Sequence, residues 1–216
     1  MEVYQRVKAE INLDALDYNI KNIQKKIGNR KMIGIVKADA YGHGAVRVSK
    51  VLEKNGVTDF AVSNIDEAME LRNNGIKGNI LLLGYTPNGR YSDVIFYNIT
   101  QAIFTYQDAK ELSDFAKNIG LTAKVHIKLD TGMGRIGFLA NEDAVSVIKN
   151  IINLPNIKVT GLFSHFATAD EKDKTFRDEQ LKKFKLVHEK LKEKGIFIEC
   201  CHIAIFCLHF VKYVLP

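Results

Sequence analysis

Residues 33–44 read IGIVKADAYGHG, a short apolar run that stops at a single lysine, Lys37. Branched apolar side chains favour a buried strand over the residues that precede this lysine. Small residues follow it, together with Gly42 and Gly44. A lysine at a strand end is usually a solvated surface residue. An amine held between a buried strand and flexible backbone is also suited to covalent chemistry. Lys37 is therefore either a surface lysine or a reactive one, and the segment alone does not distinguish the two.

Apolar runs alternate with helical patterns on both sides of this segment. Strands are predicted at 31–37, 59–63, 79–84, 101–105, 123–129, 157–164 and 196–201, and helices at 13–27, 43–55, 64–74, 107–118, 140–150 and 181–191, with a less regular helical stretch around 88–97. No hairpin signal joins two strands, so parallel strands with helical crossovers are expected. A doubly wound sheet and a (β/α)8 barrel both satisfy this pattern. The length favours an α/β TIM-type barrel that is incomplete, because about seven strands are predicted where closure needs eight.

The composition is that of an ordinary globular protein, with 46% apolar and 26% charged residues. The net charge of +6 comes from lysines mixed with acids, which gives little support to nucleic-acid binding. No run approaches the ~18 apolar residues of a membrane span. The three cysteines do not form a disulfide framework or a recognised zinc pattern. We therefore expect a cytoplasmic protein without a metal site, a nucleic-acid partner or a membrane partner.

Polar residues mark several predicted strand ends. Lys37, Lys128, Asp130, His165 and His202 each lie at or near the end of a strand. In a barrel the carboxyl ends of the strands share one rim, where the chemistry is done. A histidine at such a position is more often structural than catalytic, but four strand ends directed to one rim favour a site.

The segment KLDTGMGRIGF (128–138) adds a glycine-rich loop that contains Arg135. Glycines allow the backbone to approach a ligand closely, and a guanidinium suits a carboxylate or phenolate oxygen. A neutral lysine amine attacks an aldehyde to form an imine, and partial burial favours the neutral form. Lys37 is therefore a candidate for attachment of pyridoxal phosphate, whose ring stabilises carbanions.

Three segments resemble the bacterial alanine racemases. VKADAYGHGA (36–45) resembles the cofactor-lysine motif of that family. KLDTGMGRIGF and GLFSHFATAD (161–170) resemble two further blocks in the same order and at similar spacing. The similarity runs from about residue 4 to about residue 204. It implies an eight-stranded barrel followed by a β-rich domain, and interconversion of L- and D-alanine for peptidoglycan.

The resemblance also implies roles for individual residues. Lys37 would hold pyridoxal phosphate as an imine and, once displaced by the substrate alanine, act as the base on the D face. Tyr41 would bind the cofactor phosphate, and His165 would lie against the pyridine ring. Arg135 would contact the phenolic oxygen of the cofactor and the substrate carboxylate. Lys128 is carbamylated in some members of the family, which would convert it into an anion able to orient Arg135.

The chain departs from the family after His202-Ile203-Ala204, where Ile205-Phe206 replaces an Asn-Ser pair. Residues from 205 onward resemble no part of the family. We therefore expect a barrel domain over 1–204 and an aberrant apolar tail over 205–216, produced by a frameshift or a sequencing error. The eighth strand, the family's C-terminal β-domain and the second catalytic base would be missing, and the edges of the first and seventh strands would be left unpaired.

These departures leave three functional readings open. The first is a family racemase whose product is incomplete and of doubtful activity, and whose family homodimer is uncertain. The second is a barrel that binds pyridoxal phosphate without racemase activity. The third is an inert fragment.

Overall fold

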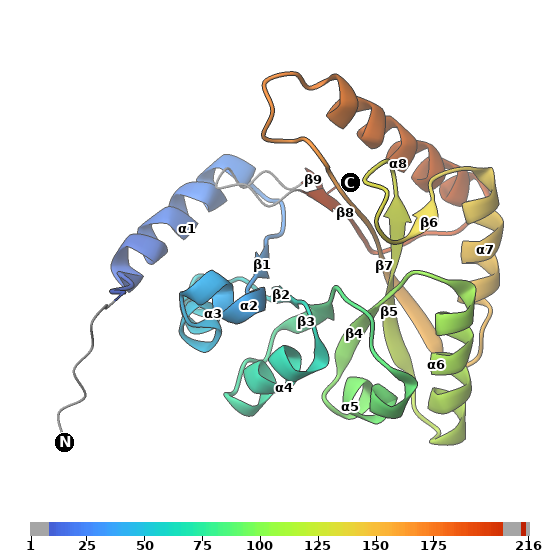
Figure 1. Ribbon diagram of the computed structural model, residues 1–216, viewed down its shortest axis with the longest axis horizontal. Coiled ribbons are helices and arrows are strands. Elements are labelled where there is room, and N and C mark those ends of the chain that lie inside the picture. The colour runs from blue at the N-terminus through green and yellow to red at the C-terminus, as the bar shows by residue number, and fades with distance from the viewer. Residues whose placement is uncertain (1–8, 205–212, 215–216) are drawn as a thin grey trace.

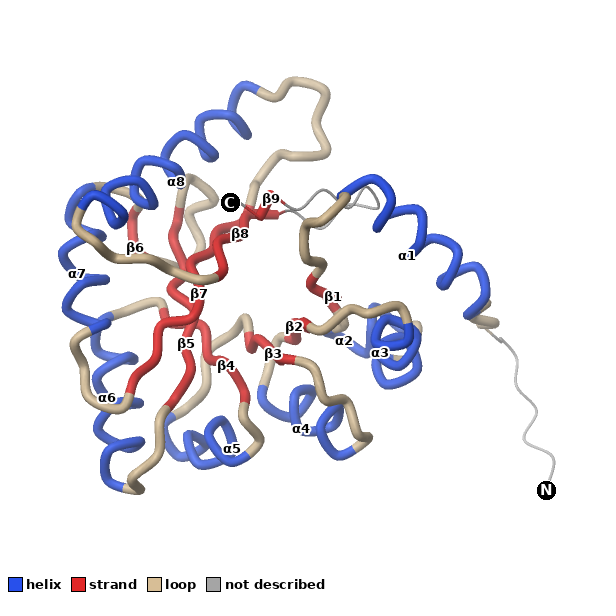
Figure 2. Tube along the Cα trace, turned by 180° about the vertical axis from the view of Figure 1, so that it is seen from behind, coloured by secondary structure: helices blue, strands red, loops and turns tan. Residues whose placement is uncertain are grey.

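The computed structural model describes residues 9–204 and 213–214. Strands and helices alternate along the chain, with the strands inside and most helices outside (Figures 1 and 2). The parallel strands are β1 (Ile33–Ile35), β2 (Asp59–Val62), β3 (Asn79–Leu82), β4 (Ile99–Ile103), β5 (Ala123–Asp130), β7 (Ile157–His165) and β8 (Cys200–Ala204). The helices are α1 (Leu13–Ile27), α2 (Lys37–Gly42), α3 (Ala45–Lys54), α4 (Ile65–Asn73), η1 (Asn88–Arg90), α5 (Tyr91–Phe96), α6 (Tyr106–Asn118), α7 (Glu142–Ile152) and α8 (Thr175–Glu193).

The strands form one sheet in the order β1-β2-β3-β4-β5-β7-β8-β9. Two short strands complete it: β6 (Phe138–Leu139) pairs with β5, and β9 (Tyr213–Val214) pairs antiparallel with β8. Among the described residues β1 pairs with β2 alone, so the sheet does not close. The prediction of an incomplete barrel with seven parallel strands is confirmed. The expectation of an unpaired edge on the seventh strand is wrong, because β9 occupies it.

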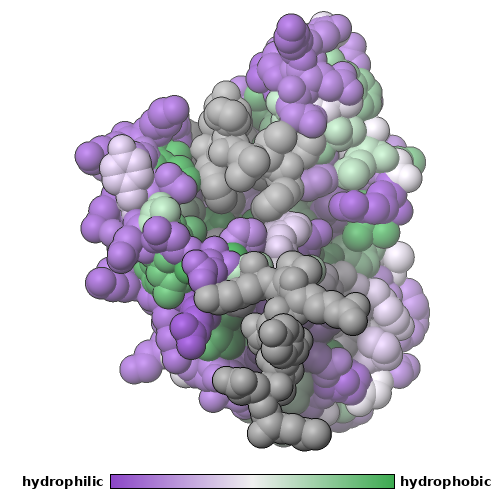
Figure 3. All heavy atoms as spheres, turned by 60° about the vertical axis from the view of Figure 1, so that its left-hand side comes forward, coloured by the Kyte–Doolittle hydropathy of each residue, from purple (hydrophilic) through white to green (hydrophobic). Residues whose placement is uncertain are grey.

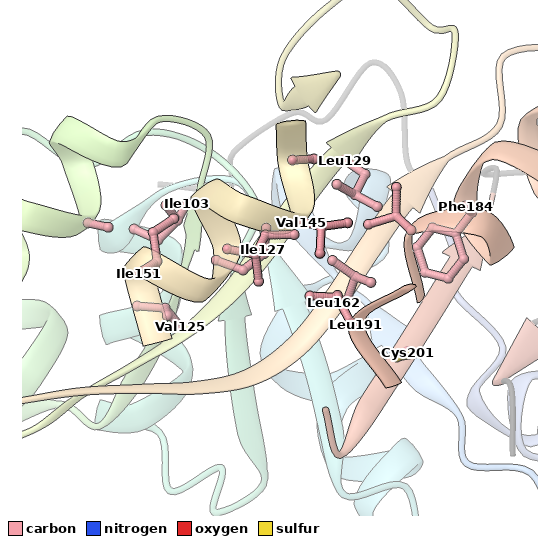
Figure 4. Close-up of a cluster of buried hydrophobic side chains, with 14 of the residues drawn as sticks. Ile103, Val125, Ile127, Leu129, Val145, Ile151, Leu162, Phe184, Leu191 and Cys201 are labelled. Carbon is pink, nitrogen blue, oxygen red and sulfur yellow. The ribbon is translucent and has the colours of Figure 1, made fainter. Parts of the chain in front are cut away.

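Apolar residues fill the space between the sheet and its helices. A large cluster joins the outward faces of β5, β7 and β8 to helices α6, α7 and α8, with Ile127, Leu162 and Phe184 fully buried (Figure 4). A second cluster packs α1, α3 and α4 on β2, β3 and the residues that flank β1, Met32 and Val36. A smaller cluster fills the barrel interior around Ala61 and Phe163. Burial of these faces provides most of the driving force for the fold. Hydrophilic side chains predominate among the coloured atoms of the face in Figure 3.

Local sequence signals set most element boundaries. Gly28 ends α1 with a φ of 59°, as its position after the apolar stripe predicts. Asn64 caps α4 by accepting the Glu67 amide at 3.0 Å, and Asn64 with Glu67 three residues on has the sequence pattern of a capping box. The Glu67 carboxylate accepts the Ser63 amide, a bond that the capping-box pattern does not predict.

The seventh parallel strand lies later in the chain than predicted. It was expected at 196–201 but spans Cys200–Ala204. The Ile196 amide instead bonds the Leu191 carbonyl and closes α8, and Ile196 and Ile198 pack against the core. The apolar residues that follow α8 therefore have the sequence pattern of a strand, although they pack against the core after the end of a helix.

Candidate active site

Lys37 lies two residues after the end of β1. The Val36 amide donates to the Ala61 carbonyl of β2 at 2.9 Å, and the chain then leaves the sheet. Ala38, Asp39, Ala40 and Tyr41 all have φ values between 50° and 56°, so they form a left-handed turn. The predicted strand to Lys37 is therefore two residues too long, and the unusual backbone falls on alanines as well as on the neighbouring glycines.

Tyr41 lies beside Lys37 because of this turn. The Lys37 Nζ is 5.9 Å from the centre of the Tyr41 ring. Lys37 is half-buried and Tyr41 is partly exposed. Burial raises the pKa of Tyr41, and the charge of Glu67 raises it further. The phenol is therefore a neutral hydrogen-bond donor at neutral pH.

Lys128 lies inside the barrel on β5, two residues before the strand ends. Its side chain is buried, its Nζ donates to the Leu129 carbonyl at 2.8 Å, and the same atom is 5.5 Å from the centre of the Phe163 ring. Burial lowers the pKa of Lys128 to about 8; the Asp130 carboxylate opposes this shift and the Arg135 charge adds to it. A neutral amine is therefore accessible here near physiological pH.

Arg135 is exposed in the loop between β5 and β6. Asp130 shapes this loop, since its Oδ1 accepts the Gly132 and Gly134 amides at 2.9 and 3.1 Å. Gly137 has a φ of 123°, and a Cβ there would lie 2.9 Å from the Lys128 carbonyl oxygen. Only glycine permits this approach, so the loop returns tightly against β5.

His165 is the last residue of β7 and is partly buried. Burial, together with the positive charges of Arg135, Lys128 and Lys37, lowers its pKa to about 4. His165 is therefore neutral at physiological pH. Lys37 and Arg135 follow the carboxyl ends of β1 and β5, while Lys128 and His165 lie at or near the ends of β5 and β7, so all four residues lie toward the same end of the barrel.

His202 does not lie at this rim, although its sequence position predicted a strand end. It is in the middle of β8, where its ring stacks on Phe163 with centroids 5.1 Å apart. Its Nε2 is 3.4 Å from Nδ1 of His126, and both imidazoles are buried. The four-residue displacement of β8 carries His202 into the barrel interior.

A cavity of about 980 Å³ opens at the opposite end of the barrel. It is lined by residues at the starts of the strands, including Ile33, Asp59, Asn79, Lys124 and Cys200. The gathered cations and the histidine lie at the carboxyl ends, where α/β barrels hold their chemistry. We therefore place the candidate site at the Lys37 end and not at this cavity.

The chain matches the family described as "Alanine racemase, N-terminal domain" over residues 11–205. The chain belongs to the alanine racemase family. It is 50% identical to an alanine racemase of Clostridium kluyveri over 195 residues, which are 90% of this chain and 50% of that protein. The chain thus spans about half the length of the curated relatives it matches.

Solved alanine racemases share the fold. The structure of the Clostridium difficile 630 enzyme in complex with cycloserine has a TM-score of 0.92 and 38% identity, covering 97% of this chain and 63% of that one. The Bacillus anthracis enzyme with bound L-Ala-P has a TM-score of 0.86 and 31% identity, covering 94% and 53%. The barrel interpretation is confirmed by these matches.

Pyridoxal phosphate is the cofactor that the alanine racemase family implies, and the residues present fit it. A phosphorylated aldehyde of this kind needs an amine for attachment, a hydrogen-bond donor for its phosphate and a positive charge beside its phenolic oxygen. The side chains of Lys37, Tyr41 and Arg135 have the matching chemistry. The neutral imidazole of His165 adds no further cation to the site. Within the described residues, no three His, Cys, Asp or Glu side chains gather as a metal site.

The sequence patterns did not indicate two residues that contact the candidate site of this alanine racemase domain. Glu67 bonds the Ala38 amide next to Lys37, and Gln180 bonds the His165 carbonyl. Glu67 carried one signal, its place in the capping box, which indicated a local role only. Gln180 lies in α8 but one residue before the helix predicted at 181–191, and it belongs to no motif, so nothing in the sequence marks it.

Proposed function

We propose that this chain is the barrel part of a pyridoxal-phosphate-dependent alanine racemase that interconverts L- and D-alanine and supplies D-alanine for peptidoglycan. The observation that carries the proposal is the half-buried Lys37 at the carboxyl end of β1, close to Tyr41 and electrostatically coupled to His165. Family membership supports the same conclusion.

Each residue contributes a distinct task to this proposal. Pyridoxal phosphate, when bound, supplies a conjugated system that delocalises the electron pair left by loss of the α proton. The Lys37 Nζ would attach the cofactor and, once released, take or return a proton on one face of the substrate. The Tyr41 hydroxyl would donate to the phosphate. Arg135 would bind the substrate carboxylate and the phenolic oxygen of the cofactor, and His165 would lie against the ring.

Lys128 is a candidate for carbamylation. A pKa of about 8 leaves part of the amine neutral at physiological pH. In the reaction with carbon dioxide the amine nitrogen forms a bond to carbon and loses one proton, which gives an anionic carbamate. That anion would neutralise part of the positive charge around Arg135 and help to orient the guanidinium.

The domain assignment follows the sequence expectation. We propose that residues 1–204 form the barrel domain and that 205–216 form an aberrant tail; all of that tail except Tyr213–Val214 lies outside the described residues. The family's β-domain and homodimer belong to the proposal for the whole protein. No described helix has the length and apolar character needed to cross a bilayer. We propose a cytoplasmic location, which the odd number of cysteines clustered near one end of the sequence supports.

Cofactor loading and turnover test the proposal together. The purified chain would be mixed with pyridoxal phosphate, reduced with borohydride and digested, and the peptide containing Lys37 would be weighed by mass spectrometry. Attachment at Lys37, absent in Lys37→Ala, is the expected result for this chain, whose second catalytic base would be missing. Racemisation of L-alanine would distinguish a racemase from a cofactor-binding barrel, and no attachment would contradict the proposal.

A further inference from the structure

The left-handed turn that follows Lys37 requires support from the rest of the fold. Ala38, Asp39, Ala40 and Tyr41 have φ values of 50–56° and ψ values of 39–50°. This conformation is unfavourable for any residue that carries a side chain. Successive residues of this kind persist only where surrounding contacts hold them.

One carboxylate provides such a contact. Glu67 Oε1 accepts the Ala38 amide at 2.8 Å, and Oε2 accepts both the amide and the hydroxyl of Ser63 at 2.8 Å. Ala38 directly follows Lys37, so this bond fixes the peptide plane between them. Glu67 itself is anchored on α4, whose Ile65, Ala68 and Leu71 are buried.

The same bonds replace the next step of the β1–β2 ladder. The Val36 amide bonds the Ala61 carbonyl, in register with the pairing of Ile35 and Ala61. Continued parallel pairing would use the Ser63 amide and then the Ala38 amide as donors. Glu67 accepts both of these donors instead. The carboxylate therefore ends the ladder at the position where the chain turns and presents Lys37.

We propose that Glu67 is a positioning residue for Lys37: its carboxylate ends the β1–β2 ladder and sets the backbone from which the Lys37 amine reaches its aldehyde ligand. The proposal rests on the function of Lys37 proposed above. Both oxygens are needed, because each accepts from a different strand end. A glutamine at 67 would present an NH2 group to one of these N–H donors.

Three matched proteins test the proposal. Glu67→Gln keeps the shape and removes one acceptor, Glu70→Gln makes the same change at an exposed site on α4, and the wild type is the reference. The first readout is the pyridoxal phosphate concentration that gives half-maximal borohydride fixation to Lys37. We expect it to rise about tenfold in Glu67→Gln, the loss typical of one charge-assisted hydrogen bond, and to stay at the wild-type value in Glu70→Gln.

The second readout does not depend on pyridoxal phosphate. Trace labelling with acetic anhydride compares Lys37 with the exposed Lys50 of the same molecule by mass spectrometry. We expect the Lys37 to Lys50 labelling ratio to change in Glu67→Gln and not in Glu70→Gln. Amide hydrogen exchange should also become faster at Ala38 and Ser63.

The outcomes separate the two proposals. Wild-type fixation and labelling in a folded Glu67→Gln protein would overturn the positioning role. If the wild type attaches no pyridoxal phosphate, the proposed function fails, but the labelling ratio still decides on Glu67. If Glu67→Gln does not fold, Ser63→Ala removes a single donor; a smaller shift of about threefold supports the proposal, and unchanged values overturn it.

Discussion

The ammonium group of Lys128 lies 5.5 Å from the centre of the Phe163 ring inside the barrel, and its Nζ bonds the Leu129 carbonyl at 2.8 Å. These contacts do not replace the hydration that the charge has lost. The pKa of Lys128 is about 8 as a result. The charged form of a buried lysine lowers the stability of the folded chain, whereas its neutral form is a better nucleophile.

We predict that Lys128→Met stabilises the folded chain at pH 7. Between pH 8 and the ordinary lysine pKa of 10.5 the unfolded chain keeps the proton that the folded chain has lost, so wild-type stability rises over this window. Below pH 8 the folded chain carries the buried charge, and its stability is lowered by the full free energy of burying that charge. The free energy of unfolding should increase by about 1–3 kcal/mol in the variant at pH 7, with a smaller difference at pH 9. Chemical denaturation measures both.

Lys124→Met, at the start of the same strand, is the control for this prediction. Lys124 is only partly buried, so its replacement should change the free energy of unfolding by less than about 0.5 kcal/mol. A Lys128→Met protein that is less stable than the wild type at pH 7 would show that the ring and carbonyl contacts outweigh the desolvation of the amine.

We predict that His165 titrates at about pH 4 in the folded chain. As the pH falls below the ordinary histidine value of 6.5, the unfolded chain takes up this proton first, so the folded state loses stability between pH 6.5 and 4. Histidine NMR spectra, assigned with His165→Gln, would give the midpoint directly. The variant should also show a shallower fall in stability over the same window. A midpoint at or above 6.5 would refute the role of burial and the neighbouring cations.

The third prediction concerns Gln180, which joins α8 to two strand ends. Its Nε2 donates to the His165 carbonyl at 3.1 Å and the Thr131 hydroxyl at 3.2 Å, and its Oε1 accepts the Ala167 amide at 2.9 Å. The side chain is fully buried. Gln180→Leu should lower the free energy of unfolding by about 2–4 kcal/mol, because several polar groups lose their partner in the interior.

Thermal and urea denaturation would test Gln180→Leu against Gln107→Leu. Gln107 bonds Glu111 on the exposed face of α6, and its replacement should cost less than about 0.5 kcal/mol. Equal effects of the two substitutions would mean that the hydrogen bonds of the Gln180 amide do not contribute to the free energy of unfolding.

The fourth prediction concerns Gly137. Alanine there would need an unfavourable φ, and its Cβ would lie 2.9 Å from backbone atoms of Lys128 and Asp130. Gly137→Ala should displace the loop that carries Arg135 and lower the free energy of unfolding by about 1–3 kcal/mol. Gly89→Ala, where a Cβ meets no atom within 4 Å, should be nearly neutral. A thermal melt of Gly137→Ala that overlays the wild-type curve would contradict the close approach of this loop.

The sequence alone predicted the order of the elements. Apolar periodicity located most strands and helices, because burial of one face imposes a repeat that a single segment already displays. It also placed Lys37 and His165 at strand ends. The positions of Lys128 within β5 and of His202 within β8 were less accurate, since a strand boundary depends on where its neighbour stops pairing.

The tertiary structure decided the features that depend on contacts between distant residues. Alanines gave no local sign of a left-handed turn, because the bond that helps to hold it comes from Glu67 on another helix. Likewise, the interior position of His202 follows from the register of β8 on β7, where Phe163 pairs with His202. Hydrophobic periodicity is encoded residue by residue, whereas register and acceptor choice are settled only when separate segments pack together.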